Sequence, residues 1–251
     1  MEHRESVTVR EPDELPSVEI PLSGVTAHEA LSSSAMTLLR VELESTAPPE
    51  WIRHPTRDAY GVVLAGELAL SVGPAESPET FDATAGDCLR IASGTDYQLA
   101  VQGEDPAVVL LGLPGDGPLF ERSSEPPATE PAESPQLASP DEFVPTAKLE
   151  NLTRLMPFPD APIQQVRGHA EGNIESQWHH HGDNEIFGHI LNGAGYVDDG
   201  STEPLLATAG SFFHIPAGIV HRDVNPQADE QDYVLWLTGS EPRNVPADEP
   251  T

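Results

Sequence analysis

Side chains of the kinds that bind metals are concentrated in one part of the chain. His179, His181 and Glu185 lie within seven residues, and His221 follows in a second cluster over 210–225. Neutral imidazoles with one carboxylate form a mixed nitrogen and oxygen donor set that suits a divalent first-row metal. Side chains two residues apart share one face of a strand, so His179 and His181 can point the same way. The sequence therefore predicts a metal site in the second half of the chain.

The residues between the second histidine and the carboxylate have the composition of a turn. Gly182, Asp183 and Asn184 let the chain bend and bring Glu185 to the same centre. His180 falls on the opposite strand face, and we interpret it as exposed to solvent or as a residue behind the ligands. The alternative, a solvated histidine loop that binds metal adventitiously, is disfavoured because the donor-type residues recur in two separate clusters.

The spacing of these clusters resembles the two motifs of the cupin superfamily. The downstream motif, Gly-x5-Pro-x-Gly-x2-His-x3-Asn, is matched at every fixed position, by Gly210, Pro216, Gly218, His221 and Asn225. The upstream motif, His-x-His-x3-Glu followed by a glycine, has seven residues between Glu185 and Gly193 where the family usually has six. The resemblance implies a small antiparallel β-barrel in which the metal ligands are His179, His181, Glu185 and His221.

Further residues of the same region are candidates for the surroundings of the metal. An apolar cavity strengthens metal–ligand electrostatics and limits the access of water. The expected lining, or packing behind it, comes from Phe187, Leu191, Phe212, Phe213, Ile215, Val234 and Trp236. His189 shares strand parity with Glu185, so it is expected either to line the cavity or to be a buried, hydrogen-bonded histidine. His214 and His169 are interpreted as structural, with His214 a further candidate behind the ligands.

The chain contains two related copies of this pattern. Trp51, His54, Asp58 and Gly66 lie 127 positions before Trp178, His181, Glu185 and Gly193, and Gly86, Gly94 and Tyr97 lie 124 positions before Gly210, Gly218 and His221. The first copy has Ile52 where the second has His179, and Tyr97 where the second has His221. Two remaining donors do not usually hold a divalent metal tightly. We therefore expect a degenerate N-terminal site at His54, Asp58 and Tyr97, in a barrel whose role is structural or, alternatively, that of a second pocket without metal.

Short alternating segments and turn residues favour an all-β fold. Strand patterns such as 36–44 and 60–72 recur at regular spacing, and no stretch shows a long helical period. With the resemblance, this predicts two tandem cupin barrels of the jelly-roll (double-stranded β-helix) type. The expected domains are an N-terminal cupin domain over 1–115, an acidic, proline-rich linker over 116–145 and a C-terminal cupin domain with the metal site over 146–251.

The charge of the chain excludes several classes of partner. Its 251 residues include 42 acidic and 12 basic ones, which gives a formal charge of −30. Such a field repels nucleic acid and anionic membranes. A surface rich in acids and nearly free of lysine resembles that of cytosolic proteins from halophilic archaea, where salt screens the self-repulsion. Cys88 is the only cysteine, and the N-terminus lacks a secretory pattern, so we expect a soluble cytoplasmic protein.

The predicted ligand set points to catalysis. Three histidines and one glutamate leave one or two positions open on an octahedral metal, whereas a structural site is closed. Similar cupins are dioxygenases, decarboxylases and isomerases that act on small organic molecules, and we favour dioxygenase-like oxidoreductase chemistry on a small aromatic or carboxylate substrate. The alternatives are a non-catalytic metal-dependent binding or sensor protein and a purely structural bicupin. The metal is Fe, Mn, Ni, Zn or Cu, and the family resemblance also implies pairing into homodimers.

Overall fold

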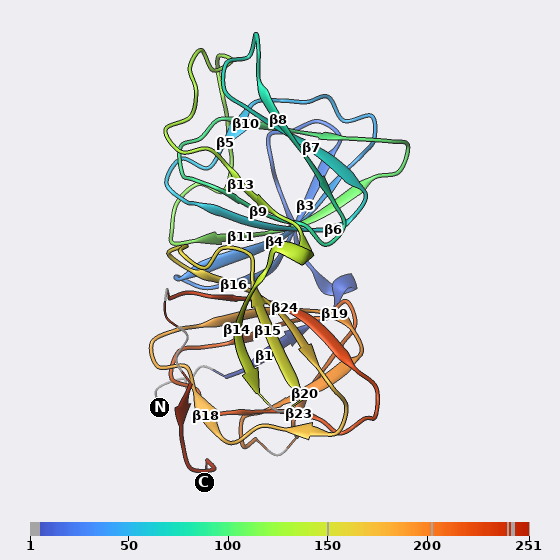
Figure 1. Ribbon diagram of the computed structural model, residues 1–251, viewed down its shortest axis with the longest axis vertical. Coiled ribbons are helices and arrows are strands. Elements are labelled where there is room, and N and C mark those ends of the chain that lie inside the picture. Colours follow the sequence, from blue (N-terminus) through green and yellow to red (C-terminus); the bar gives the residue numbers. More distant parts are fainter. Residues whose placement is uncertain (1–5, 150, 202, 240, 242–243, 251) are drawn as a thin grey trace. The chain divides into compact units, whose positions relative to one another are not determined.

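The computed structural model describes residues 6–149, 151–201, 203–239, 241 and 244–250, and it is nearly all β (Figure 1). Two short 3-10 helices, η1 (Pro12–Glu14) and η2 (Pro140–Glu142), are the helical elements of the described part. None of the described helices has the length and apolar character needed to cross a membrane. The predicted fold class, two tandem β-barrels of the jelly-roll type, is confirmed.

Two compact units divide the chain. One consists of residues 16–142, and the other combines residues 1–15 with 143–251. The division differs from the expected domain boundaries because the N-terminal arm belongs to the unit of the C-terminal barrel. The expected linker also takes part in a barrel, since its strands pair within the unit of residues 16–142.

The unit of residues 16–142 contains two antiparallel sheets. The larger has the order β13 (Gln136–Ala138), β9 (Cys88–Ile91), β6 (Ala59–Ala65), β11 (Ala107–Pro114), β4 (Met36–Leu43), β3 (Val25–Ser32) and β2 (Ser17–Val18). The smaller has the order β12 (Glu121–Arg122), β5 (Ile52–Arg53), β10 (Tyr97–Val101), β7 (Glu67–Val72) and β8 (Glu79–Thr84). The alternate residues Leu39, Val41 and Leu43 of β4 enter one apolar core with Leu68 and Leu70 of β7. This core joins the facing sheets, as in a barrel with one inner surface.

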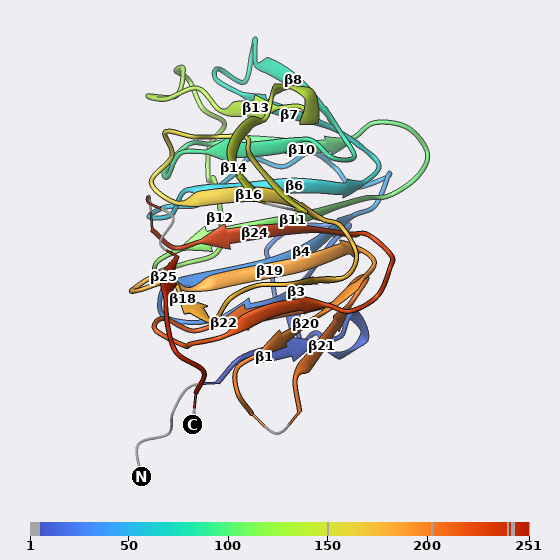
Figure 2. The same cartoon turned by 60° about the horizontal axis from the view of Figure 1, so that its bottom comes forward.

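The other unit repeats this arrangement. Its large sheet has the order β1 (Thr8–Arg10), β22 (Phe212–Ile215), β19 (Ile186–Asn192), β24 (Gln231–Leu237), β16 (Gln164–Ala170), β15 (Leu152–Met156) and β14 (Val144–Leu149). Figure 2 shows β22, β19, β24 and β16 as successive strands. The facing sheets are β17 (Ile174–Glu175), β23 (Arg222–Asn225), β20 (Ala194–Asp198) and β21 (Leu205–Thr208), and the pair β18 (His179–His180) with β25 (Val245–Pro246).

Equivalent glycines fix the hairpins of the two barrels. Gly66 lies between β6 and β7, and Gly193 lies between β19 and β20, with φ of 81° and 77°. A Cβ at Gly193 would lie 2.2 Å from the carbonyl oxygen of Glu230, and one at Gly66 would lie 2.8 Å from that of Pro106. Only glycine combines a positive φ with such a close approach of another backbone segment. The matching positions confirm the duplication that the sequence spacing predicts.

The same kind of arm closes one edge of each large sheet. Strand β1 pairs with β22 in the register Thr8 to His214, and β13 pairs with β9 in the register Gln136 to Arg90. A Pro-Asp-Glu 3-10 turn follows each arm strand. Val7, beside β1, is buried in the apolar core of the C-terminal barrel. The arm therefore covers backbone groups that an open sheet edge would expose.

Candidate metal centre

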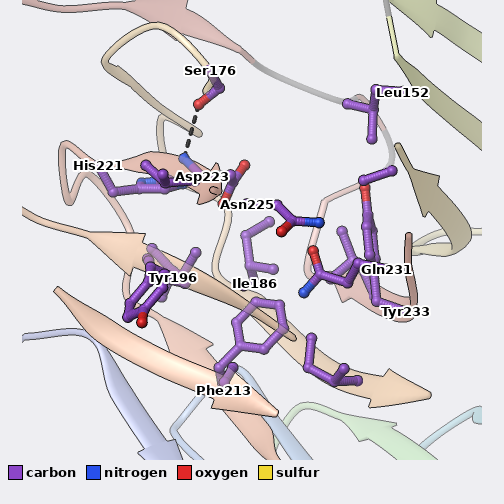
Figure 3. A pocket seen from close by; sticks show the side chains of 18 of the residues that line it. Leu152, Ser176, Ile186, Tyr196, Phe213, His221, Asp223, Asn225, Gln231 and Tyr233 are labelled. Carbon is purple, nitrogen blue, oxygen red and sulfur yellow. Dashed lines mark hydrogen bonds between the residues drawn. The ribbon is translucent and has the colours of Figure 1, made fainter. Parts of the chain in front are cut away.

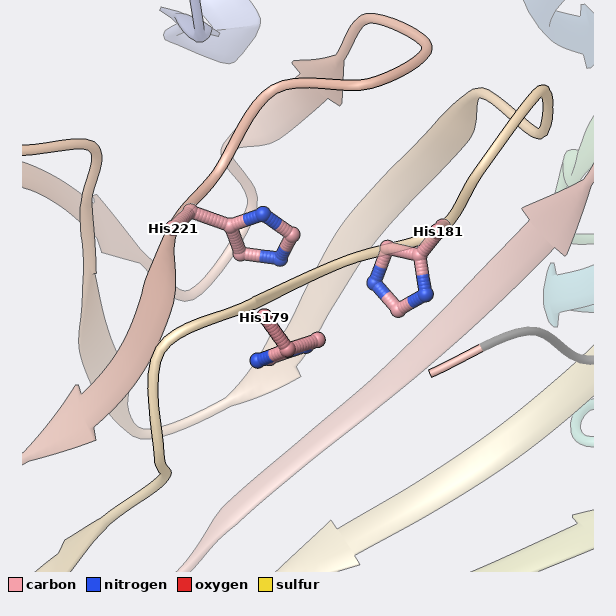
Figure 4. Close-up of side chains that lie close together, drawn as sticks. All are labelled: His179, His181 and His221. Carbon is pink, nitrogen blue, oxygen red and sulfur yellow. The ribbon is translucent and has the colours of Figure 1, made fainter. Parts of the chain in front are cut away.

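Three of the predicted ligands come together at one end of the C-terminal barrel. The ligand-type nitrogens of His179, His181 and His221 all lie within 4.8 Å of one another, and all three residues are buried (Figure 4). The ring centroids of His179 and His221 are 4.5 Å apart, and that of His181 lies 4.9 Å and 5.1 Å from them. Two separate motifs of the chain thus form a single nitrogen-donor cluster.

Backbone pairing holds two of these ligands side by side. The N–H of His179 donates to the carbonyl of His221 and the N–H of His221 donates back to the carbonyl of His179, each at 2.9 Å. On its other side, His179 pairs with Pro246 of β25. The strand that carries His179 is therefore supported from both edges, and its side chain starts from a backbone position that the fold fixes.

Hydrogen bonds orient the imidazoles for metal binding. The Nδ1–H of His179 donates to the carbonyl of Gln177 at 2.8 Å, and the Nδ1–H of His221 donates to the carbonyl of Ile219 at 3.0 Å. In this tautomer each Nε2 carries a free lone pair. The Nε2 of His221 is buried and has no hydrogen-bond partner in the described part of the chain. A divalent metal would satisfy that atom, so the donor set fits the expected ion.

Burial also favours the metal-binding protonation state. It lowers the pKa of His179 from its ordinary value, and the nearby carboxylate of Asp223 offsets only part of that effect. A lower pKa keeps the imidazole neutral, which is the form that coordinates metals.

Glu185, the fourth predicted ligand, lies elsewhere. Its Oε2 is 2.7 Å from Nε2 of His214, and both side chains are largely buried. In the N-terminal barrel the equivalent positions hold Asp58 and Arg90, which form an ion pair at 3.0 Å. The acid therefore belongs to an acid–base pair that both barrels repeat and not to the histidine cluster.

Strand parity explains the position of Glu185. Ile186 and Ile190 face the interior of the barrel, where both belong to the apolar core. Glu185 is one residue out of phase with them and therefore on the other face of the strand. The extra residue between Glu185 and Gly193 in the sequence already indicates that Glu185 is shifted to the other face of the strand. The six-residue spacing of the family would instead start from Ile186, which cannot bind a metal.

A cavity of about 80 Å³ lies beside the histidines inside the barrel (Figure 3). Its walls are mostly apolar, with His181 and His221 at the metal side. Phe213 and Ile215 line it, in agreement with the expectation, and Gly188 leaves the space that the Phe213 ring occupies. The other candidates differ: the cavity walls do not include Phe187, His189, Leu191, Phe212, His214, Val234 or Trp236. These seven side chains alternate with the inward ones along β19, β22 and β24, so they lie on the outer face of the sheet.

Further polar residues line the cavity. Arg154, Tyr196, Asp223 and Tyr233 are ionisable, and Asn225 and Gln231 add amides. Tyr233 acts on the guanidinium of Arg154 and raises its pKa. Asp223 follows His221 by two residues in an extended segment, a spacing that places both on one face and could have identified it. The position of Arg154 on β15 carries no comparable signal.

Burial and neighbouring charges act in opposite directions on the pKa values of Asp223 and Arg154. Burial raises the pKa of Asp223, but the neighbouring His221, His179 and Arg154 lower it and leave that pKa below its ordinary value. Burial acts to lower the pKa of Arg154, while Tyr233 and Asp223 raise it and prevail. The cavity therefore contains one carboxylate and one guanidinium in their charged forms.

The equivalent site of the N-terminal barrel is closed by its own side chains. Nε2 of His54 is 2.6 Å from the hydroxyl of Tyr97, and Nδ1 is bonded to the carbonyl of Leu119. Burial lowers the pKa of His54 to about 4. Asp58 binds Arg90 and the N–H of Ser93. Among the described residues, His54, Asp58 and Tyr97 do not belong to a group of side chains that could hold a metal ion.

Comparisons with known proteins agree with the architecture. A family model described as "Cupin domain" matches residues 39–112 and 169–237, which together are more than half of the chain. No curated protein sequence matches.

Solved structures give the same result for the fold. A variant of Bacillus subtilis oxalate decarboxylase has a TM-score of 0.74 at 12% identity, over 97% of this chain and 80% of that one. The oxalate decarboxylase of Lactobacillus farciminis in complex with formate has a TM-score of 0.71 at 13% identity, over 95% of this chain and 88% of that one. At such identities the likeness shows a shared two-barrel fold.

Proposed function

Because the chain belongs to the cupin family, we propose that its C-terminal barrel is a metal-dependent oxidoreductase, dioxygenase-like, that acts on a small organic carboxylate. The observation that carries the proposal is the cluster of His179, His181 and His221, of which His181 and His221 line one cavity. Three nitrogen donors from one side leave further positions of a metal open to ligands, as a catalytic centre requires.

His179, His181 and His221 are the residues that would hold the metal. When bound, a divalent transition metal supplies a Lewis acid and, if it is redox-active, a means of bringing dioxygen and an organic substrate together. His179 and His221 contribute Nε2, because their Nδ1 atoms are committed to backbone carbonyls. The chain's own residues would then bind and orient the substrate and exclude water from the site.

The cavity limits the size of the substrate. A cavity that holds a single water offers about 10–15 Å³ by this measure, and this one offers about 80 Å³. A molecule of a few non-hydrogen atoms fits such a space, whereas a flavonol does not. The apolar walls, which include Ile186, Phe213 and Leu235, would limit the access of water to a metal held by the histidines.

Arg154 gives the cavity a preference for anions. Its guanidinium lines the wall, and its Nε is buried with no hydrogen-bond partner in the described part of the chain. Guanidinium groups bind carboxylates with charge-assisted hydrogen bonds. A substrate carboxylate held by Arg154 would lie in the same cavity as His181 and His221.

Decarboxylation of a small acid is the second candidate. The charged pair Arg154 and Asp223 inside an apolar cavity favours it, and the similar structures named above are oxalate decarboxylases. Oxygen uptake in step with substrate loss indicates the dioxygenase, while carbon dioxide release without net oxygen uptake indicates the decarboxylase. Binding of a small acid without turnover would instead assign a metal-dependent binding or sensor protein.

The test combines metal analysis with turnover. Purified protein is loaded in turn with iron, manganese, nickel, zinc and copper, and uptake is compared with that of His221→Ala. His169→Ala is the matched control, because that imidazole is 40% exposed and pairs with Asp232 away from the cavity. We expect about one metal per chain in the wild type and the control, and loss in His221→Ala. Oxygen and carbon dioxide are then followed with oxalate, small β-dicarbonyls, catechols and gentisate. The proposal fails if the metal-loaded protein neither consumes oxygen nor releases carbon dioxide with any of these compounds.

A further inference from the structure

We infer that Asp223, and not Glu185, supplies the carboxylate ligand of this metal centre. The inference rests on the proposed metal site at the three histidines and adds a residue that neither the spacing of the motifs nor the histidine cluster assigns. With Asp223, the centre has the three-nitrogen, one-oxygen donor set that its sequence predicts, but the oxygen donor comes from β23.

The position of Asp223 on its strand is the first observation. It follows His221 by two residues and lines the same cavity, so both side chains face the interior (Figure 3). Its backbone is fixed against Ser176: the N–H of Asp223 donates to Oγ of Ser176 at 2.8 Å, and the N–H of Ser176 donates to the carbonyl of Asp223 at 2.9 Å. The fold thus holds the base of this side chain beside the metal ligands.

The carboxylate of Asp223 has no partner of its own. In the described part of the chain no hydrogen bond or ion pair reaches its oxygens, whereas Glu185 is bound by His214 and Asp198 by Arg222. Arg154 influences Asp223 through space without an ion pair between them. A charged carboxylate in an apolar cavity is costly unless a cation accompanies it. A divalent metal at the adjacent imidazoles provides that cation.

The surroundings of Asp223 place it next to all three histidines. His181 and His221 line the same cavity as Asp223, and the ligand nitrogen of His179 lies within 4.8 Å of theirs. The three nitrogens form the tight group, and Asp223 lies beside it rather than within the same 4.8 Å. Since no hydrogen bond holds its oxygens, the carboxylate is free to change between staggered rotamers about the Cα–Cβ bond.

The sequence supplies a reason for the exchange of ligands. Ile186 takes the inward position from which the upstream motif would offer its acid, so β19 presents only apolar groups to the metal. Ile186 and Asp223 line the same cavity from facing sheets. The carboxylate that β19 does not provide is thereby replaced by one from the facing sheet.

Cobalt(II) is the probe for the test, because its visible absorption reports the number and kind of its ligands. Full-length wild type, Asp223→Asn and Glu185→Gln are titrated with cobalt(II), and the thermal midpoint of each apoprotein is measured as a check on folding. We expect Asp223→Asn to weaken cobalt binding tenfold or more and to change the spectrum. Glu185→Gln should keep the wild-type spectrum and an affinity within threefold. Asp223→Glu, which retains a carboxylate, should recover most of the wild-type absorption.

The outcomes separate this inference from the proposed function. If wild-type protein and His221→Ala bind cobalt alike, the metal site itself is wrong and both fall. If His221→Ala loses cobalt while Asp223→Asn keeps the wild-type affinity and spectrum, only the assignment of Asp223 is overturned. A Glu185→Gln variant that alone changes the spectrum would return the ligand role to Glu185.

Discussion

His179 and His221 exchange both of their backbone hydrogen bonds, with each N···O distance at 2.9 Å. Residues 42 positions apart in sequence are thereby aligned as direct cross-strand neighbours, and their imidazole centroids lie 4.5 Å apart. The pairing fixes the backbone of two proposed metal ligands. Preorganisation of this kind reduces the ordering cost of binding.

Metal binding to this prearranged site should stabilise the folded protein. A ligand that binds only the native state at about 100 times its Kd adds ~2.7 kcal/mol to the free energy of unfolding. We expect manganese or cobalt to raise the thermal midpoint by several degrees and EDTA to reverse the rise. His221→Ala should show no shift, while His169→Ala should respond as the wild type does. Equal shifts in His221→Ala would mean that the ion binds somewhere else.

Arg154 should control the affinity for substrate. In Arg154→Gln the cavity loses its only guanidinium among the described lining residues, so a carboxylate substrate loses a charge-assisted hydrogen bond. Such bonds contribute about 1.5–3 kcal/mol, so KM should rise at least tenfold with a smaller change in kcat. Arg122→Gln is the charge-matched control, because that side chain is 60% exposed and lies in the other unit. An unchanged KM in Arg154→Gln would remove Arg154 from substrate binding.

The Glu185–His214 pair should contribute to stability. Both side chains are mostly buried, at 16% and 13% exposure, and the bond between them is 2.7 Å long. Loss of a hydrogen bond to a charged group costs about 1.5–3 kcal/mol. Glu185→Gln and His214→Gln should each lower the thermal midpoint, and the double variant should fall by less than the sum of the two. Additive losses would show that the two side chains are energetically independent.

His54 should make the N-terminal barrel sensitive to acid. Burial lowers its pKa from 6.5 to about 4 in the folded protein, so between these values the unfolded chain binds one more proton. Stability from this group is therefore complete above about pH 6.5 and is lost as the pH falls toward 4, by ~3 kcal/mol. His54→Gln should flatten the pH dependence of the thermal midpoint over this range. An NMR titration of the His54 ring that gives an ordinary pKa would contradict the prediction.

The N-terminal arm should stabilise the C-terminal barrel. Deleting residues 1–10 removes β1 from the edge of β22 and Val7 from the apolar core. Exposed edge strands pair with other chains, so the truncated protein should unfold at lower temperature and aggregate more readily. The exposed Thr8 provides the control, since Thr8→Ala keeps the backbone pairing. Unchanged unfolding of the truncated protein would show that β1 adds nothing to the barrel.

The sequence by itself determined the duplication and the histidine cluster. Motif spacing carries that information because glycines at positive φ, such as Gly66 and Gly193, and the histidines must recur at fixed positions in each barrel. The sequence also gives the residues that share one face of a strand, once one inward-facing residue of that strand is known. The chain alone thus predicts two barrels, a cluster of His179, His181 and His221, and a degenerate first site.

Only the tertiary structure decided the phase and the long-range pairing. One extra residue before Gly193 places Glu185 on the outer face and Ile186 on the inner one, and the same phase puts Phe213 rather than Phe212 in the cavity. Periodicity alone cannot fix this, because a shift by one residue exchanges the two faces of a strand. The pairing of Thr8 with His214 joins segments about 200 residues apart, and no local pattern encodes such a contact. For the same reason, the convergence of Arg154 and Asp223 from separate strands on one cavity emerges only in the folded chain.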